Sequence, residues 1–552
     1  MKALNVSARH RIKLIFGLLL LSIPCFLYGQ GQTYSYFYRV YLKDKGENAT
    51  GKYSVSDLLS SRAISRRQKA GIQVPDIRDI PVDINYLNQI SLLGLKLHCT
   101  SKWLNTALFK SQSAFDIQRL FDLPFVSNVR TVKTPGKKSS FNDKLNFQVT
   151  LSDLPPFDRP LTMINGNPMH DSGYDGKDVL IAILDGGFIN ADNISSLNSL
   201  RSRNGIRTTY DFVTKNRSVY NSSAHGTAVL SVLAGNISGQ IEGTAPGADF
   251  LLLKTEDVES EFPCEEDFWA AGAEFADSSG ADIISSSLGY FNFDDSTLNY
   301  KRSDLDGNTA FVTRAADLAA SKGILVVNSA GNERTSAWQR IIFPSDGDSV
   351  LAVGAVDGND VISDFSSAGP SADGRIKPDN VAMGVNVPVQ ISGNTVGRSN
   401  GTSFSCPVIS GISACLMQAV PFALNNDIIN VLRLSADRYN SPDSLYGYGI
   451  PDIVSALNKL QNLYFKIPAN GVIVGPNPTK GNFEIIFQSP RANFTVELFS
   501  MTGGLIFRRD FTDYAGRTVL ITELQNRTQG IYLLRVIEGS EVDVRKIIKL
   551  KN

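Results

Sequence analysis

The 552-residue chain has few of the residues that form disulfides or bind metals. It has five cysteines, one of them in the N-terminal leader, and four histidines. So few cysteines support no disulfide framework. Cys406 and Cys415 lie nine residues apart on one predicted helix, a rise of about 13 Å that is too long for a disulfide. Cys406 is expected to be a buried packing residue. No group of cysteines and histidines has the spacing of a zinc site.

An excess of one charge is also missing. The chain has 54 basic and 54 acidic residues, a formal net charge of zero, which gives no support to a polybasic nucleic-acid-binding protein. The neutrality is a cancellation between unequal parts. Residues 31–150 hold 18 basic and 9 acidic residues, whereas residues 151–462 hold 20 and 37. We expect these two parts to attract each other, which steers association more than it sets affinity.

Outside the N-terminus, no hydrophobic run reaches transmembrane length. Within residues 1–29, four basic residues precede the short apolar run Ile15–Ile23, and Pro24 and Gly29 follow it. This pattern predicts a cleaved secretory signal, with an uncleaved anchor as the alternative. The length of the remaining chain predicts several domains.

Short apolar runs alternate with helical patterns between residues 155 and 462. The runs typical of strands buried on both faces are Val179–Leu184, Phe250–Leu253, Ile283–Leu288, Ile324–Val327 and Val350–Val356. The helical patterns are Gly226–Ala234, Glu265–Ala276 and Thr309–Ala320. This alternation predicts an α/β domain with a mostly parallel, doubly wound sheet. Ligands of such sheets bind beyond the C-terminal ends of the strands.

Three polar residues stand where such a sheet would hold a site. Asp185 ends the first strand, His225 opens a helix and is the only histidine inside the α/β repeat, and Ser403 lies near the N-terminus of an apolar helix. Singly, they have plain structural roles as a strand-end carboxylate, a hydrogen-bonded histidine and a helix N-cap. Together they supply what a serine nucleophile needs, a neighbouring base that a third group orients.

Five ordered blocks carry a family resemblance. Asp185-Gly186-Gly187, His225-Gly226-Thr227 and Gly401–Pro407 occur in the order Asp, His, Ser and resemble the active-site segments of subtilisin-like serine proteases. Asn328–Glu333 is similar to the family's oxyanion segment, and Ser286–Gly289 to its substrate-pairing strand. A sixth block, at residues 448–452, looks like the family's closing segment. The resemblance covers about 300 residues and implies the subtilisin-like form of the predicted fold.

The resemblance also implies roles for single residues. Ser403 would be the nucleophile, His225 the general base and Asp185 the group that orients it. Asn332 and the backbone N–H of Ser403 would stabilise the oxyanion. The substrate backbone would pair with three consecutive residues, Ser287, Leu288 and Gly289.

The chain departs from the family pattern in two places. Gly186 stands where the family usually has Thr or Ser, which removes a hydroxyl near the triad and puts local rigidity in question. Asn400 and Phe404 replace the usual Ser and Met and look like packing variants. Catalysis is expected to require no cofactor and no metal. Structural calcium is common in the family, and the acidic stretches Asp304–Asn308 and Asp357–Asp360 could bind it, although solvated loops are the simpler interpretation.

Residues 30–150 are predicted to form a separate α+β unit. Its predicted strands and helices are Tyr34–Leu42, Val55–Lys69, Leu93–Cys99, Asn105–Phe109, Phe115–Phe121 and Val126–Val132. The pattern is similar to the prosegments of secreted subtilases, which help the protease to fold and inhibit it until they are cleaved. A permanent accessory domain is the alternative. The stretch Thr134–Leu151, rich in Lys, Ser, Gly and Asn, is the predicted linker and cleavage zone.

From residue 464 onward, short strand-like runs alternate with Gly, Pro and Asn turns, which predicts a small β-sandwich-like domain. The segments Gly475–Pro478, Gly481–Phe483 and Gly530–Val536 and a basic end resemble the C-terminal sorting domain of type IX secretion substrates. The resemblance implies export across the outer membrane. A carbohydrate-binding or generic β-sandwich appendage is the alternative.

The predicted plan is a signal peptide (1–29), a prosegment with its linker (30–150), a peptidase domain (151–463) and a sorting domain (464–552). We expect a secreted or cell-surface serine endopeptidase that acts on polypeptides. Its expected partners are its own prosegment, as an intramolecular inhibitor, and the type IX secretion machinery, with no nucleic acid and no transmembrane anchor in the mature form. A proteolytically inactive binding protein on the same scaffold and a processing enzyme for one partner are the alternatives. The sequence does not fix cleavage specificity.

Overall fold

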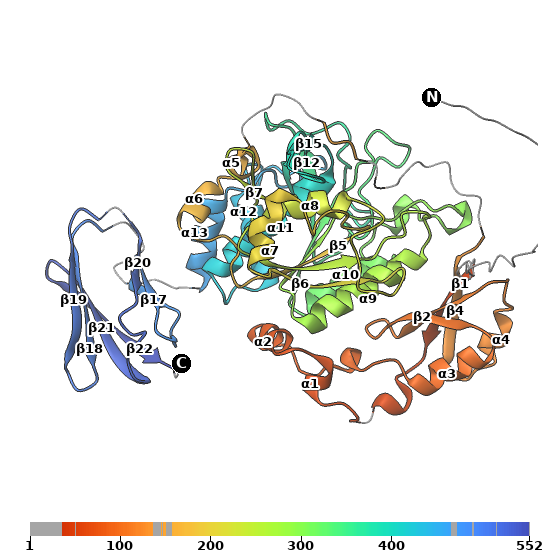
Figure 1. Ribbon diagram of the computed structural model, residues 1–552, viewed down its shortest axis with the longest axis horizontal. Helices are drawn as coiled ribbons and strands as arrows, with labels where there is room; N and C mark the ends of the chain where they lie inside the picture. Colours follow the sequence, from red (N-terminus) through yellow and green to blue (C-terminus); the bar gives the residue numbers. More distant parts are fainter. Residues whose placement is uncertain are drawn as a thin grey trace, which may run out of the picture.

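The computed structural model describes residues 36–49, 51–135, 145, 147–150, 157–464, 472–487, 491–514 and 516–550. The predicted signal peptide lies outside these residues, as does most of the predicted linker. Figure 1 shows three bodies in the chain, named here the N-terminal unit (36–135), the central domain (157–464) and the C-terminal module (472–550).

The described residues of the central domain form a seven-stranded sheet in which every pair of neighbours is parallel. In sheet order the strands are β13 (Asn380–Met383), β12 (Val350–Val356), β11 (Leu325–Ser329), β10 (Ile283–Ser286), β5 (Leu180–Asp185), β9 (Asp249–Lys254) and β6 (Ile206–Asp211). All C-terminal strand ends therefore meet at one edge. This arrangement confirms the predicted parallel α/β fold.

Helices cover both faces of this sheet (Figure 1). One layer consists of α8 (His225–Ala234), α11 (Thr402–Ala419), α12 (Asn425–Ser435) and α13 (Ile453–Tyr464), and the other of α9 (Cys264–Ser279) and α10 (Phe311–Ser321). On β5, Ile181 and Ile183 join the first core, whereas Leu180, Ala182 and Leu184 join the second. A strand buried on both faces needs an unbroken apolar run, which is why the sequence revealed it.

Shorter elements complete the central domain. They are α5 (Arg159–Met163), α6 (Asn167–Asp171), α7 (Asn198–Ser202), β7 (Asn236–Ile237), β8 (Ile241–Glu242), β14 (Val387–Val389) and β15 (Gly397–Ser399), with the 3₁₀ turns η3 (Ser195–Leu197), η4 (Ser296–Leu298) and η5 (Arg302–Asp304). Strands β14 and β15 form an antiparallel pair. Strand β15 matters most for the site, because the chain continues from it into α11.

In the part of the chain that the structure describes, none of the four cysteines is joined in a disulfide. Cys406 and Cys415 are fully buried in α11, as predicted for Cys406. Burial raises the pKa of the Cys406 thiol to about 12. The thiol is therefore not a reactive thiolate at neutral pH.

The N-terminal unit is an antiparallel sheet with helices on one side, which agrees with the predicted α+β pattern. The strands, in sheet order, are β2 (Lys96–Ser101), β3 (Thr106–Ser111), β1 (Tyr36–Leu42) and β4 (Val126–Lys133). The helices are α1 (Val55–Leu58), α2 (Ser61–Lys69), α3 (Ile84–Leu92) and α4 (Gln118–Phe121), with the turns η1 (Gly46–Ala49) and η2 (Ile77–Asp79). The single helix predicted over Val55–Lys69 was wrong, because Leu59 and Ser60 are extended and the Ser60 side chain caps α2.

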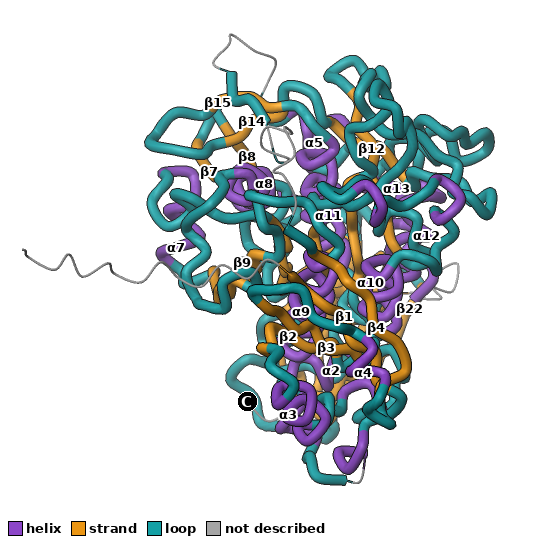
Figure 2. The backbone as a smooth tube through the Cα atoms, turned by 90° about the vertical axis from the view of Figure 1, so that its right-hand side faces the viewer, coloured by secondary structure: helices purple, strands orange, loops and turns teal. Residues whose placement is uncertain are grey.

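This sheet lies against α9 and α10 of the central domain (Figures 1 and 2). The Arg39 side chain of β1 is buried at the contact and donates to Asp267 Oδ1 and Oδ2 from Nε, at 2.9 Å each. Its Nη2 also donates to the Pro263 carbonyl at 2.7 Å, and its guanidinium lies 3.6 Å from the centre of the Phe311 ring. A buried charge is tolerated only when it is paired in this way.

Helix α2 makes a second buried contact with α9. Arg66 and Arg67 each donate to a different oxygen of Asp277, and Arg67 also pairs with Asp79 at 2.6 Å. Three residues before Asp277 on α9, Glu274 accepts hydrogen bonds from the Ser101 hydroxyl at 2.6 Å and from backbone N–H groups. Along α9 the N-terminal unit thus supplies the cations and the central domain the anions, in line with their opposite net charges. At Lys322 the polarity is reversed, because this central-domain ammonium pairs with Asp76 of the N-terminal unit at 2.9 Å.

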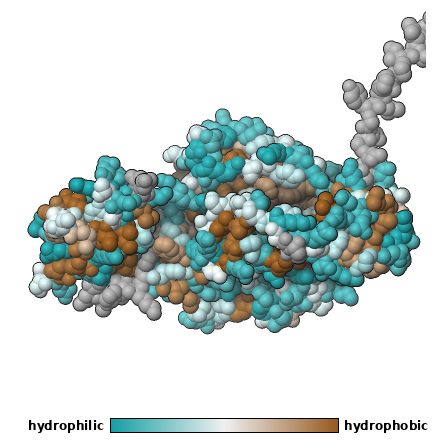
Figure 3. All heavy atoms as spheres, turned by 90° about the horizontal axis from the view of Figure 1, so that it is seen from below, coloured by the Kyte–Doolittle hydropathy of each residue, from teal (hydrophilic) through white to brown (hydrophobic). Residues whose placement is uncertain are grey.

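The C-terminal module consists of two antiparallel sheets around one apolar core. One sheet has the order β16 (Val472–Gly475), β17 (Phe483–Phe487) and β20 (Thr518–Ile521); the other has β19 (Leu505–Phe511), β18 (Phe494–Ser500), β21 (Gly530–Glu538) and β22 (Glu541–Lys549). This confirms the predicted β-rich module. Apolar side chains, coloured brown, gather on the left of Figure 3. The exposed apolar residues of this module include Leu505, Leu520, Val542 and Val544. Among the described residues, no helix has both the length and the apolar character needed to cross a membrane.

We predict that Asp277→Asn loosens the N-terminal unit. The substitution leaves two buried arginines with one fewer countercharge, and breaking a buried pair typically costs about 3–5 kcal/mol. Hydrogen–deuterium exchange should show faster exchange of the β1–β4 amides. The control is Glu47→Gln, which removes an exposed ion pair with Lys52 (3.6 Å) and should cost less than about 1 kcal/mol. Unchanged protection of β1–β4 in Asp277→Asn would contradict this account.

Candidate active site

Asp185 and His225 are hydrogen-bonded at the C-terminal edge of the sheet. Asp185 is the last residue of β5, and His225 is the first residue of α8. Both side chains are buried, and His225 Nδ1 lies 3.0 and 2.9 Å from the two carboxylate oxygens. A carboxylate at this distance accepts the Nδ1 proton, so Nε2 is left to act as a base.

The glycine after the histidine allows α8 to approach the turn after β5. A Cβ on Gly226 would lie 2.6 Å from the Gly187 carbonyl oxygen and 2.7 Å from the Phe188 ring. Its N–H donates to the same carbonyl at 3.1 Å. The backbone N–H of His225 is in turn held by the Ser223 hydroxyl at 3.1 Å. These contacts fix the start of α8 and hence the position of the imidazole.

Ser403 is the second residue of α11, so it is not the N-cap that a structural role would require. The cap position belongs to Gly401, whose φ of +147° suits a residue without a side chain. The backbone N–H groups of the first helical turn have no partner inside the helix, and the helix dipole favours negative charge there. The Ser403 N–H is one of these groups.

The Ser403 carbonyl accepts a hydrogen bond from a side chain, because Pro407 cannot supply the usual helical N–H donor. In an α-helix this carbonyl would accept from the N–H of the residue four positions later, and proline has none. The Ser287 hydroxyl takes over and donates to the Ser403 carbonyl at 2.9 Å. Ser287 follows directly after β10, so this bond joins the predicted substrate-pairing strand to the predicted nucleophile.

Asn332 is oriented by its contact with Thr402. The backbone N–H and the hydroxyl of Thr402 both donate to Asn332 Oδ1, at 2.9 Å each. The Thr402 hydroxyl also accepts from the Gly331 N–H at 3.2 Å. Because Oδ1 faces two donors, the Nδ2 amide protons are directed away from Thr402. Sequence reasoning identified Asn332 but missed Thr402, whose role depends on a contact across 70 residues.

These residues meet in one cleft with a volume of about 280 Å³. Its walls include His225, Ser403 and Asn332, together with the predicted substrate-binding residues Ser287, Leu288 and Gly289. The Leu288 carbonyl accepts from the Asn328 amide at 3.1 Å, which anchors this stretch to the end of β11. The cleft therefore gathers residues from four separate blocks of the sequence.

Two residues of the predicted linker also line this cleft. The Phe147 ring meets the His225 ring edge-on, with 5.3 Å between centroids, and lies 5.9 Å from the Phe404 ring. Leu145 lines the same cleft and contacts the site of Gly186. Sequence reasoning missed these contacts, because the segment has the composition of a linker.

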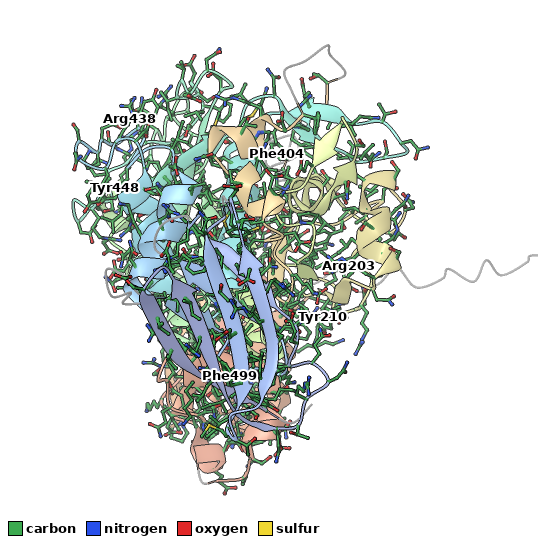
Figure 4. The ribbon with its side chains drawn as sticks, turned by 90° about the vertical axis from the view of Figure 1, so that its left-hand side faces the viewer. Arg203, Tyr210, Phe404, Arg438, Tyr448 and Phe499 are labelled. Atoms are coloured by element: carbon green, nitrogen blue, oxygen red, sulfur yellow. The ribbon has the colours of Figure 1, made fainter. Side chains whose placement is uncertain are left out.

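The two departures from the family pattern have visible consequences. The Gly186 N–H donates to Asp185 Oδ1 at 2.7 Å, so the carboxylate keeps a local donor without a hydroxyl side chain. A Cβ on Gly186 would lie 2.2 Å from Leu145 Cδ1, so the missing side chain makes room for Leu145. Phe404 is fully buried yet lines the cleft beside His225, and therefore does more than fill the core. Figure 4 places it in the upper part of the molecule, well away from Phe499 of the C-terminal module.

The predicted calcium loops use their carboxylates locally. Asp306 Oδ1 accepts from the N–H groups of Asn308 and Thr309, and Asp357 Oδ1 from those of Asn359 and Val361. These are the turn-stabilising contacts that Asp makes in ordinary loops. They fit the simpler interpretation of both stretches as loops.

One acidic cluster does occur among the described residues. Glu256, Glu261 and Glu265 have carboxylate oxygens within 4.8 Å of one another, and the first two line the cleft. The Tyr290 hydroxyl donates to Glu256 at 2.9 Å. Together with Asp294 these residues make one wall of the cleft acidic.

Comparisons with known proteins agree with this geometry. The sequence model of the subtilase family matches residues 176–449, that of the Bacteroidota peptidase S8 propeptide domain matches residues 37–147, and that of the secretion system C-terminal sorting domain matches residues 474–550. The chain belongs to the subtilase family. It is a subtilisin-like serine peptidase with a propeptide domain and a sorting domain that directs it to secretion or the cell surface.

Individual relatives support this membership. Subtilisin E of Bacillus subtilis is 30% identical over 299 residues, which cover 54% of this chain and 70% of the relative. A thermostable alkaline protease of Halalkalibacterium halodurans is 31% identical over 306 residues, covering 55% and 74%. The crystal structure of fervidolysin from Fervidobacterium pennivorans, described as a keratinolytic enzyme related to subtilisin, aligns with a TM-score of 0.54 at 16% identity, over 94% of this chain and 77% of that one. At that identity the likeness shows the fold alone.

We predict that Ser287→Ala destabilises the central domain by about 1–3 kcal/mol. The substitution leaves the buried Ser403 carbonyl without the donor that replaces the missing N–H of Pro407, and an unsatisfied buried carbonyl costs that much. Urea denaturation followed by tryptophan fluorescence would measure it. Ser296→Ala, at an exposed position, should unfold at the wild-type midpoint. Equal midpoints for all three proteins would show that the carbonyl finds another partner.

Proposed function

We propose that the protein is an endopeptidase that hydrolyses peptide bonds through Asp185, His225 and Ser403. Ser403 Oγ attacks the carbonyl carbon of the substrate while His225 Nε2 accepts its proton. His225 then gives this proton to the leaving amine, and a water molecule hydrolyses the acyl-enzyme by the same path. Asp185 holds the imidazole in the tautomer that leaves Nε2 free and stabilises the imidazolium.

The oxyanion that forms in each step needs donors that are already in place. Asn332 supplies its Nδ2 amide, and the first turn of α11 supplies the Ser403 N–H. Thr402 acts through Asn332, since it holds the opposite end of that amide. The reorganisation of these dipoles is therefore complete before substrate arrives, which is the main source of their effect on rate.

One observation carries the proposal. The Asp185–His225 hydrogen bonds lie at the edge of a cleft that Ser403 and Asn332 also line, although the four residues come from separate blocks of the sequence. A proteolytically inactive binding protein on the same scaffold would not need these four residues together. The neutral and acidic walls of the cleft accommodate a polypeptide, and catalysis needs no cofactor.

We infer that the N-terminal unit acts as the intramolecular inhibitor and that the C-terminal module is the address read by the type IX secretion machinery. The propeptide match and the buried ion pairs with α9 support the first role. The sorting-domain match supports the second. We further infer removal of a signal peptide over residues 1–29 and the domain boundaries given by the sequence.

The test of the proposed function is a pair of substitutions. Ser403→Ala should abolish hydrolysis of a casein-type substrate, because it removes the hydroxyl whose proton His225 accepts in the proposed mechanism. Asn332→Ala should lower kcat by about 10²–10³ with little change in KM, since its amide acts on the transition state; that range is known from a subtilisin and is carried over. Turnover near wild type in purified, folded Ser403→Ala protein would refute the assignment.

The affinity of the N-terminal unit for the central domain should depend on pH through the ionisation of His98. Its Nε2 lies 2.9 Å from the Phe212 carbonyl, and burial lowers its pKa from 6.5 to about 4. Docking therefore requires neutral His98, and the affinity falls progressively as the pH drops from about 6.5 toward 4. Between pH 7.5 and 5.5 the contribution of His98 should weaken binding about tenfold.

The inhibition constant of the released prosegment, measured at both pH values for wild type and His98→Gln, checks this. Burial raises the pKa values of Glu266, Asp267 and Glu274, and these carboxylates favour docking at lower pH, opposite to His98. They are the same in both proteins, so the ratio of the two inhibition constants isolates His98. A ratio that does not change with pH would rule the histidine out.

A further inference from the structure

Ile342 closes the cleft at the place where the substrate side chain before the cleaved bond would enter. We propose that Ile342 restricts the enzyme to a small side chain, such as that of alanine, at this position of the substrate. The proposal rests on the proposed function, since it concerns the residue whose carbonyl Ser403 attacks. It adds a preferred class of substrate, namely polypeptides with a small residue on the acyl side of the bond.

The groups that hold the reacting carbonyl also decide where the adjoining side chain lies. In the proposed mechanism the Asn332 amide and the Ser403 N–H hold the carbonyl oxygen, while the substrate backbone pairs with Ser287–Gly289. The side chain of the attacked residue is carried by the Cα next to that carbonyl carbon. It therefore enters the space between two walls, Ser287–Gly289 and the segment 329–332, both of which contribute residues to the lining of the cleft.

Each wall carries a glycine that faces Ile342. A Cβ on Gly289 would lie 2.1 Å from Ile342 Cδ1, and a Cβ on Gly331 would lie 3.0 Å from the same atom. The walls therefore lack side chains where this methyl group approaches, and the methyl group occupies the room that they leave. Ile342 lines the cleft with only 8% of its surface exposed. A substrate side chain that enters between the walls meets Ile342 instead of an open pocket.

Backbone hydrogen bonds to both walls hold this floor in place. Phe343 and Tyr290 exchange two backbone hydrogen bonds, of 3.3 and 3.0 Å, and the Ile342 N–H donates to the Ala330 carbonyl at 3.1 Å. The Ile342 carbonyl in turn accepts from the Ser345 N–H at 2.8 Å. The side chain is branched at Cβ, which restricts its χ1 angle, and its surroundings are close-packed. Moving it aside would therefore be costly.

A large substrate side chain meets this floor before its carbonyl reaches the oxyanion donors. An aromatic ring would have to displace Ile342 or lift the carbonyl away from Asn332 and Ser403. Misplacement of the reacting carbonyl lowers the rate of the chemical step and not only the affinity. A lysine side chain is the other candidate for this position, because Glu333 also lines the cleft. Its long stem, however, needs the depth that Ile342 removes.

The test uses two peptide p-nitroanilides that differ only in the residue before the cleaved bond, alanine or phenylalanine. We expect wild type to have a kcat/KM at least about tenfold higher for the alanine substrate. Ile342→Ala removes the atoms that lie between the two glycines and should raise the phenylalanine-to-alanine ratio of kcat/KM about 10- to 200-fold. This ratio does not depend on the concentration of active enzyme, so partial unfolding of the variant leaves it unchanged.

Ile341→Ala is the matched control. Ile341 is the preceding residue, of the same type and fully buried in the core that contains α9 and α10. Its truncation removes the same atoms from the protein interior, and the ratio should stay at the wild-type value. An Ile342→Ala ratio equal to that of wild type, or the same rise in Ile341→Ala, would overturn the proposal.

A casein digest tests the preference without any variant. Mass spectrometry of the fragments that wild type releases should show new C-termini that are mainly small residues, such as Ala, Ser and Val. C-termini that are mainly aromatic residues or lysine would overturn the proposed floor and leave the proposed function standing. Absence of any Ser403-dependent hydrolysis of casein would refute both.

Discussion

Helix α11 is buried at 16 of its 18 residues, and the constraint this imposes organises the whole site. A buried helix needs a partner for every backbone group, and Pro407 removes one donor from its first turns. The Ser287 hydroxyl donates to the Ser403 carbonyl, which lacks its helical donor. This hydrogen bond holds the end of β10 against the residue that carries the nucleophile. Only the N-terminal turn of α11 reaches the cleft. The apolar core thus holds one end of a helix dipole at the place where negative charge develops.

The remaining residues of the site are fixed by the same geometry of parallel strands. Asp185 is the last residue of β5, and Ser287 and Asn332 follow the ends of β10 and β11. These three strands are neighbours in the sheet, so their C-terminal ends meet at one edge. His225 is carried by α8, which packs against α11. The positions of these side chains depend on where their strands end, and the strands end at the edge of the apolar core.

Much of this could be predicted from the sequence, for reasons that particular elements make clear. Strand β5 has the unbroken apolar run of a strand covered on both faces, and its last residue is the carboxylate. The edge strands β6 and β13 were missed, because a half-covered or very short strand has no such run. Thr402 and Phe147 could not be found either, since each acts through a contact far away in the sequence. Local composition identifies Phe147 as linker, and only the tertiary fold places its ring on His225.

Helix α9 carries three acidic residues in its first turn, Glu265, Glu266 and Asp267. In the chain described here, Arg39 neutralises part of this charge from the N-terminal unit. The position of these residues at the positive end of the helix macrodipole gives them a second source of stabilisation that does not leave with the arginine. Departure of the N-terminal unit would therefore uncover an anionic surface without leaving a strained one, and water would replace the guanidinium. Helix α9 is therefore suited to two environments. In one, its acidic first turn is buried and paired with Arg39, and in the other it is exposed to water.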